Sequence, residues 1–192
     1  SDRKVSAVVD GEAIYSEEVI WEPRKHSDPS YHYNEVMAAL KTAAAKMPRV
    51  DAIGGSSAGI YIDNRPMVAS LFRSVPREKY DEIHAMFLRI REELGVPLEV
   101  INDGDVTALA GSMSLEDNGV LGIAMGSSEA AGYVDLQGHI LSWLSELASP
   151  GLVPRACLIR RLSSTERRAA WKLRRAEGSS PRAQGAHAVL VF

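Results

Sequence analysis

The chain has 192 residues and a formal net charge of −3, with 45% apolar and 24% charged residues, the balance of an ordinary globular protein with a sizeable core. Its single cysteine, Cys157, excludes an internal disulfide framework and a cysteine-rich zinc site. No window is apolar over the ~18 residues of a membrane span, and the first residues lack the apolar stretch of a signal peptide. We therefore expect a cytoplasmic protein with no membrane partner.

Alternating polarity, helical spacing and turn residues predict the elements of residues 1–112. They are, in chain order, two strands near 4–9 and 12–21 joined at an Asp-Gly turn, a helix over 31–47, a strand near 50–54 followed by a Gly/Ser loop, a helix over 76–94, a strand over 96–101, and a short helix over 105–111 that Asp105 caps.

The next segment, 113–150, continues the alternation of strands and helices. We expect a strand over 118–126, a loop over 127–132, a strand pair over 133–141 and the start of a helix at 142–148. Strands that alternate with helices indicate an α/β fold, and the early hairpin makes the sheet mixed.

The last segment, 151–192, differs in composition. It holds nine Lys or Arg residues against two acidic ones, and its strand and helix patterning is poor. Several explanations stay open: a flexible or peripheral tail, contact with a polyanion or with the acidic remainder of the chain, and out-of-frame translation of a GC-rich gene.

The most suggestive polar group follows the predicted strand over 96–101. Asn102 and Asp103 come where that strand ends and just before a helix, and ligands of open α/β sheets bind at this edge. A helix N-terminus favours an ionised carboxylate, and such a carboxylate accepts a hydroxyl proton as a general base. Asn-Asp-Gly-Asp is also good turn and cap chemistry, so a purely structural role stays open.

Two Gly/Ser segments are candidates for other chemistry. Residues 125–135 follow a strand and offer backbone N–H groups to a phosphate, although Glu129 would repel that phosphate unless Mg²⁺ intervened. Residues 55–59 fit G-x-S-x-G, which would make Ser57 a hydrolase nucleophile. That motif requires a helix directly after the serine, and extended chain is expected here.

The remaining polar residues suggest no site. The five histidines are scattered, no pair has metal-ligand spacing, and we expect them to be solvated. No patch that combines aromatic and basic residues precedes the tail, so nucleic acid is not an expected partner.

The order of three segments resembles the ROK family of sugar kinases and repressors, within the actin/hexokinase/Hsp70-like ATPase superfamily. The segments are DAIGGSSAGIYID (51–63), IREELGVPLEVINDGDVTALAG (90–111) and LGIAMGSSEAAGYVDLQGHI (121–140). The resemblance spans about residues 4–148. The chain shows no D-x-G-G-T phosphate loop, few of the glycines of the family's second phosphate loop, and no His/Cys zinc motif.

The resemblance implies an actin-like (ribonuclease H-like) α/β domain over 1–112 and the beginning of a second such domain over 113–150. It implies that Asp103 is the catalytic base toward a sugar hydroxyl, that Asn102 and Asp105 bind the sugar, and that the phosphates of ATP, with Mg²⁺, lie against three residues, namely Gly126, Ser127 and Ser128.

These implications lead to two functional hypotheses. The first is an ATP-dependent sugar kinase, incomplete as this chain. The alternative is a non-catalytic regulator that senses a sugar or a nucleotide with the same fold. Because an incomplete second domain would expose apolar residues such as Ile140 and Leu141, we also expect self-association.

Overall fold

The computed structural model describes residues 2–125, 129–141 and 186–191. They form two compact units. Within the described residues, the first unit contains 2–101 with 186–191, and the second contains 102–125 with 129–141. The division falls between Ile101 and Asn102, whereas the expected boundary after residue 112 lies inside a helix.

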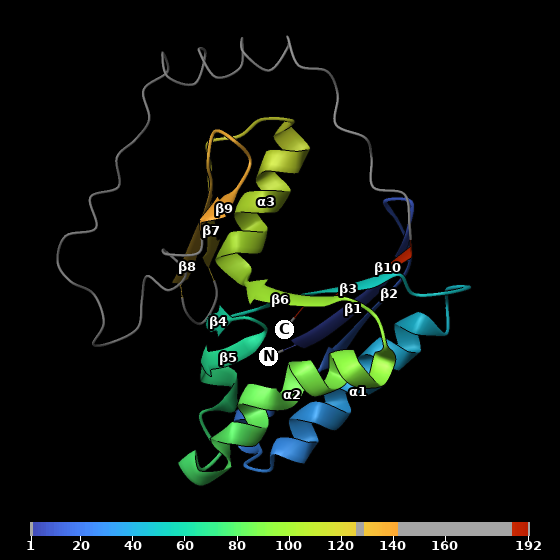
Figure 1. Ribbon diagram of the computed structural model, residues 1–192, viewed down its shortest axis with the longest axis vertical. Helices are drawn as coiled ribbons and strands as arrows, with labels where there is room; N and C mark the ends of the chain where they lie inside the picture. The colour runs from blue at the N-terminus through green and yellow to red at the C-terminus, as the bar shows by residue number, and fades with distance from the viewer. Residues whose placement is uncertain (1, 126–128, 142–185, 192) are drawn as a thin grey trace, which may run out of the picture. The chain divides into compact units, whose positions relative to one another are not determined.

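The first unit is built on a five-stranded mixed sheet with the strand order β2-β1-β10-β3-β6 (Figure 1). The strands are β1 (Asp2–Val9), β2 (Glu12–Ile20), β3 (Ala52–Ser57), β6 (Leu98–Asn102) and β10 (Ala186–Val191). Strand β10 pairs antiparallel with β1 and parallel with β3. The mixed α/β fold expected from the sequence is thereby confirmed.

The β1–β2 hairpin forms because Asp10 and Gly11 adopt positive φ angles of 50° and 84°. Two successive left-handed residues are the geometry of the tight turn that matches strand twist, and Asp-Gly is well suited to it. The predicted hairpin is confirmed.

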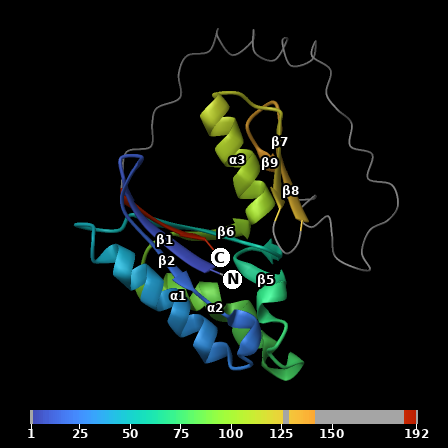
Figure 2. The same ribbon diagram turned by 180° about the vertical axis from the view of Figure 1, so that it is seen from behind.

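Two long helices, α1 (Pro29–Ala44) and α2 (Tyr80–Leu94), lie together along this sheet (Figures 1 and 2). Asp28 is the N-cap of α1, and its side chain accepts a hydrogen bond from the Ser30 N–H at 3.1 Å. Gly95, with a φ of 67°, is the C-cap of α2. Both ends follow ordinary capping chemistry, and both predicted helices are confirmed with slightly shifted ends.

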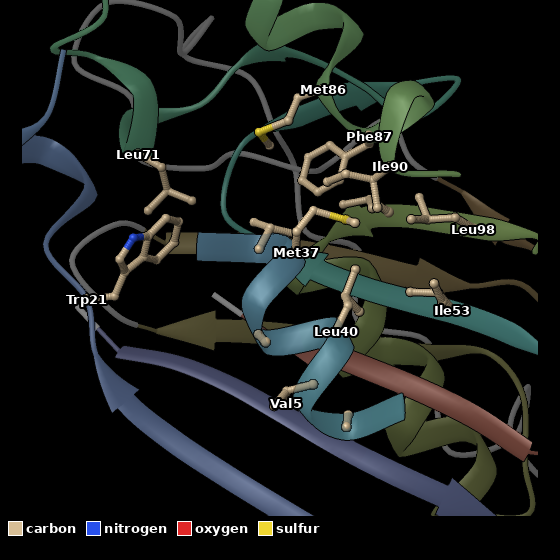
Figure 3. Close-up of a cluster of buried hydrophobic side chains, with 14 of the residues drawn as sticks. Val5, Trp21, Met37, Leu40, Ile53, Leu71, Met86, Phe87, Ile90 and Leu98 are labelled. Atoms are coloured by element: carbon tan, nitrogen blue, oxygen red, sulfur yellow. The ribbon is translucent and has the colours of Figure 1, made fainter. Parts of the chain in front are cut away.

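The hydrophobic core of the first unit lies between the sheet and these helices (Figure 3). Helix α2 contributes a stripe at helical spacing, formed by Ile83, Met86, Phe87 and Ile90, each at most 3% exposed. Burial of a large apolar side chain contributes about 1.5–3 kcal/mol, so this stripe fixes which face of α2 meets the sheet.

A second hairpin and three short 3-10 helices complete the first unit. They are β4 (Ile60–Ile62), β5 (Arg65–Val68), η1 (Pro23–Lys25), η2 (Ser70–Phe72) and η3 (Arg77–Lys79). The expected Gly/Ser loop after residue 54 is wrong, because β3 continues to Ser57. Gly55 belongs in that strand for a packing reason: a Cβ there would lie 2.8 Å from a methyl group of Val100.

In its described residues, the second unit contains one helix and a small antiparallel sheet in the order β7-β8-β9. Its elements are α3 (Asp103–Leu115), β7 (Val120–Met125), β8 (Glu129–Val134) and β9 (Ile140–Leu141). The expected loop over 127–132 is wrong from Glu129 onward, since those residues form β8. The helix expected at 142–148 lies outside the described residues.

Glycines let α3 pack tightly on β7 and β8. A Cβ on Gly122 would lie 2.2 Å from the Ala108 nitrogen, and one on Gly132 would lie 2.3 Å from the Asp105 Cα. These separations are far below van der Waals contact, so the helix backbone rests directly on the strands. The small residues over 129–132, which were expected to form a loop, are therefore the residues that the close approach of helix and strand requires.

The C-terminal segment holds a strand that the sequence analysis missed. Residues 186–191 form β10 between β1 and β3, where a peripheral tail was expected. The expectations for 151–185 lie outside the described residues. None of the helices among the described residues is long and apolar enough to cross a membrane.

Candidate functional site

The candidate site is the junction at which β6 ends and α3 begins. Asn102 is the last residue of β6, and its side-chain oxygen accepts a hydrogen bond from the Gly104 N–H at 2.7 Å. Asn102 is thus the N-cap of α3, and the expectation that Asp105 caps this helix is wrong. The first N–H groups of a helix that starts at Asp103 have no intrahelical partners, and the Asn102 side chain binds one of these N–H groups.

Asp103 is half-buried at the first position of α3. Burial raises the pKa of its carboxyl, and the hydrogen bond that the Gly104 N–H donates to it, at 3.1 Å, opposes this rise only in part. A carboxylate whose pKa is raised by desolvation binds a proton more readily than a solvated aspartate does. Asp103 is therefore suited to accept a hydrogen bond or a proton from a hydroxyl group.

The other two acidic or amide candidates are more enclosed than Asp103. Asn102 is 2% exposed and Asp105 is 1% exposed. The Asp105 backbone lies directly against β8 at Gly132. Of the three polar residues at this junction, Asp103 alone keeps partial access to solvent, and the sugar-binding roles of Asn102 and Asp105 stay predictions.

The expected phosphate-binding residues, Gly126, Ser127 and Ser128, lie outside the described residues. In sequence they fall between Met125 at the end of β7 and Glu129 at the start of β8. No cluster of three or more His, Cys, Asp or Glu residues that could hold a metal ion occurs in the part of the chain that the structure describes.

Ser57 does not have the setting of a hydrolase nucleophile. It is fully buried at the end of β3, and its hydroxyl donates to the Ala58 carbonyl at 3.4 Å. The next element is strand β4, not a helix. The nucleophile elbow needs a strand-to-helix turn that exposes the serine, so this geometry does not support the hydrolase hypothesis.

His32 contradicts the expectation of solvated histidines. It lies in α1 and is fully buried, with ring contacts at right angles to Phe72 and Tyr31 at centroid distances of 5.1 and 5.5 Å. Its Nε2 lies 3.3 Å from the His26 carbonyl oxygen. Desolvation lowers the pKa of His32, so the fold favours the neutral imidazole.

Sequence reasoning missed Asn64, in the turn between β4 and β5. Its buried side chain forms hydrogen bonds with the backbone of β6 at Leu98 and Val100. The Asp63-Asn64 pair between apolar alternating segments is a recognisable turn signal, but nothing local indicates that its amide reaches a strand more than thirty positions further on.

Comparison with known proteins gives a match among solved structures. No family model matches the chain, and neither does any curated protein sequence. Among solved structures, the chain is similar to one described as a ROK family transcriptional regulator, a homologue of the E. coli Mlc protein, with a TM-score of 0.56 and 18% sequence identity. The chain shares the fold of that regulator.

The match covers 88% of this chain and 46% of the regulator, so the chain spans less than half of its length. The comparison agrees with the fold that the ROK resemblance implies. It gives no support to the expectation that nucleic acid is not a partner, because the neighbour is described as a transcriptional regulator.

Proposed function

We propose that this chain is part of a ROK-like regulator that senses a sugar and has no phosphotransfer chemistry of its own. The fold shared with a transcriptional regulator supports this hypothesis over the kinase hypothesis. The proposal places the protein in the cytoplasm, with a small sugar as ligand, self-association of the chain, and the remainder of a two-domain protein around the ligand.

The observation that carries the proposal is the chemistry of the β6–α3 junction. A half-buried carboxylate, Asp103, stands at a helix N-terminus, next to the buried amide of Asn102. Carboxylates and amides are the groups with which proteins orient the hydroxyls of a polar ligand. The rigid cap formed by the Asn102 oxygen and the Gly104 N–H holds the carboxylate in place before a ligand arrives.

The kinase hypothesis stays as a second candidate because burial raises the pKa of Asp103. A raised pKa brings a carboxyl closer to the range in which a general base works. In that case Asp103 removes the proton of the attacking sugar hydroxyl. ATP with Mg²⁺ supplies the phosphoryl group, and Gly126, Ser127 and Ser128 are the residues proposed to line its phosphates.

A thermal denaturation series separates the two hypotheses. The full chain is heated with D-glucose, D-mannose or N-acetyl-D-glucosamine, each with and without Mg·ATP. A ligand present at 100 times its Kd stabilises the folded state by about 2.7 kcal/mol. The sensor hypothesis expects a sugar-dependent rise in Tm that ATP does not alter, and no phosphorylated sugar.

Two carboxylate variants complete this experiment. Asp103→Asn keeps the size of the side chain and removes its charge, and Asp81→Asn makes the same change at a fully exposed position on α2. The sensor hypothesis expects that Asp103→Asn weakens sugar binding and Asp81→Asn does not. Sugar phosphorylation by the wild type that Asp103→Asn abolishes establishes the kinase, and no Tm rise with any of the three sugars overturns the sensor.

A further inference from the structure

Asn64 stands out as a buried polar residue with backbone strain and a distant partner. It lies in the β4–β5 turn with a φ of 62°, after Asp63 with a φ of 50°, and it is 6% exposed. Asparagine tolerates the left-handed region better than most residues. The turn therefore places a carboxamide, a group with one acceptor and two donors, in the interior of the first unit.

The carboxamide pairs with β6 as a residue of a neighbouring strand would. The Val100 N–H donates to Asn64 Oδ1 at 2.6 Å, and Asn64 Nδ2 donates to the Leu98 carbonyl at 3.1 Å. A residue of a neighbouring parallel strand makes the same two hydrogen bonds, one to the C=O of one residue and one to the N–H of the second residue after it. Asn64 thus binds β6 in the way that one residue of a neighbouring strand would.

The geometry of β6 shows which edge Asn64 occupies. The Pro97 carbonyl, one residue before Leu98, accepts from the Ile53 N–H of β3 at 2.9 Å. Since successive residues of a strand point their backbone groups to opposite sides, Leu98 and Val100 face away from β3. In the order β2-β1-β10-β3-β6, that side is the outer edge of the sheet formed by the described residues.

The pairing also depends on the amide being neutral. Asn64 Nδ2 donates to a Glu99 carboxylate oxygen at 3.2 Å as well as to the Leu98 carbonyl. An aspartate at position 64 offers no donor and brings a second carboxylate beside Glu99. Asn64→Asp therefore leaves the Leu98 carbonyl without its partner and adds repulsion, although it hardly changes the volume of the side chain.

We propose that Asn64 is a positioning residue for the sugar site, a role that rests on the function proposed above. The anchored residue Val100 precedes Asn102 by two positions on the same strand, and Asn102 caps α3 and orients Asp103. An edge strand held on one side only frays from its end. The carboxamide of Asn64 prevents this fraying, so the Asn102–Gly104 cap stays formed in the absence of ligand.

The test is hydrogen exchange of the Gly104 amide in the full chain, since that N–H donates to Asn102 and Asp103 and is not one of the groups that pair with Asn64. We expect Asn64→Asp to speed this exchange about ten-fold, the effect of losing a buried hydrogen bond, with no more than a two-fold change at Leu40 in α1. Asp63→Asn, an exposed change in the same turn, is the matched control and leaves both amides unchanged.

A second control separates positioning from general loss of stability. Ile83→Val removes one methylene from the core of the first unit, where Ile83 is fully buried, and makes no change at β6. If Asn64→Asp raises exchange at Leu40 as much as at Gly104, in the pattern of Ile83→Val, Asn64 is only structural and the proposal is overturned. An unchanged Gly104 amide overturns it as well.

Sugar affinity is the functional measurement, made with whichever of the three sugars binds. Asn64→Asp is expected to weaken binding about ten-fold at a temperature where the variant is fully folded, and Asp63→Asn to leave it unchanged. If Asn102→Ala binds the sugar as the wild type does, the proposed site is wrong, while the exchange of Gly104 still decides the role of Asn64. If Asn102→Ala binds weakly and Asn64→Asp binds normally, the site stands and the positioning role fails.

Discussion

Gly132→Ala tests whether the contact between α3 and β8 sets the position of Asp103. The added Cβ would lie 2.3 Å from the Asp105 Cα and 2.5 Å from both the Asp105 nitrogen and the Gly104 carbonyl oxygen. Ordinary contact begins near 3.4 Å, so the first turn of α3 must retreat by about 1.1 Å. All three obstructing atoms belong to the backbone and cannot rotate away.

Overpacking costs about 1–3 kcal/mol, and obstruction by backbone places Gly132→Ala near the upper end of that range. The lower chain entropy of alanine in the unfolded state offsets about 0.4–1 kcal/mol. We therefore expect a net loss of about 2 kcal/mol in the second unit, measured as faster hydrogen exchange of the α3 amides, together with weaker sugar binding because Asp103 lies on the displaced turn.

The control is Gly111→Ala in the same helix. Its Cβ would meet only a methyl group of Val120, at 3.2 Å, which can rotate. Alanine is also favoured over glycine inside a helix by about 1 kcal/mol. Gly111→Ala should then be neutral or stabilising. If the α3 amides of the Gly132→Ala variant exchange hydrogen at the wild-type rate, the argument from close packing is refuted.

Three further predictions concern stability. Burial lowers the pKa of His32 in the folded state below its unfolded value of about 6.5. The unfolded state therefore binds more protons at this residue, so the contribution of His32 to the free energy of unfolding should fall as pH drops from 7 to 5. Urea titrations of the wild type and of His32→Phe should differ by this contribution, and equal pH profiles would contradict it. Asn102→Ala should destabilise α3 by about 1 kcal/mol, and Asn102→Ser, which keeps a neutral capping oxygen, should destabilise it by less. Exchange of the first-turn amides measures both losses, and equal losses would show that the cap is not the cause. Ile90→Ala, at a fully buried position, should lower the free energy of unfolding by about 2–5 kcal/mol, measured by urea titration. Ile20→Ala, at a position 82% exposed, should lower it by less than about 0.5 kcal/mol.

The sequence alone predicted the elements that depend on near neighbours. The Asp10-Gly11 hairpin and the helices expected over 31–47 and 76–94 follow from interactions within one turn or between adjacent strands. Such preferences are set by backbone sterics and by burial of one face, which a short window of sequence already contains. The strand over 96–101 was predicted for the same reason, and the structure has it at Leu98–Asn102.

The tertiary structure decided what depends on distant partners. Residues 129–132 were expected to form a loop because small residues have little strand preference, yet close packing of α3 on Gly132 requires such residues within a strand. Residues 186–191 became a strand only by pairing with β1 and β3, far away along the chain. Asn64 and His32 gained their roles likewise, from β6 and from an aromatic cluster. A local pattern states what a residue prefers, whereas its partners across the fold determine which of its groups are buried, bonded or left open for a ligand.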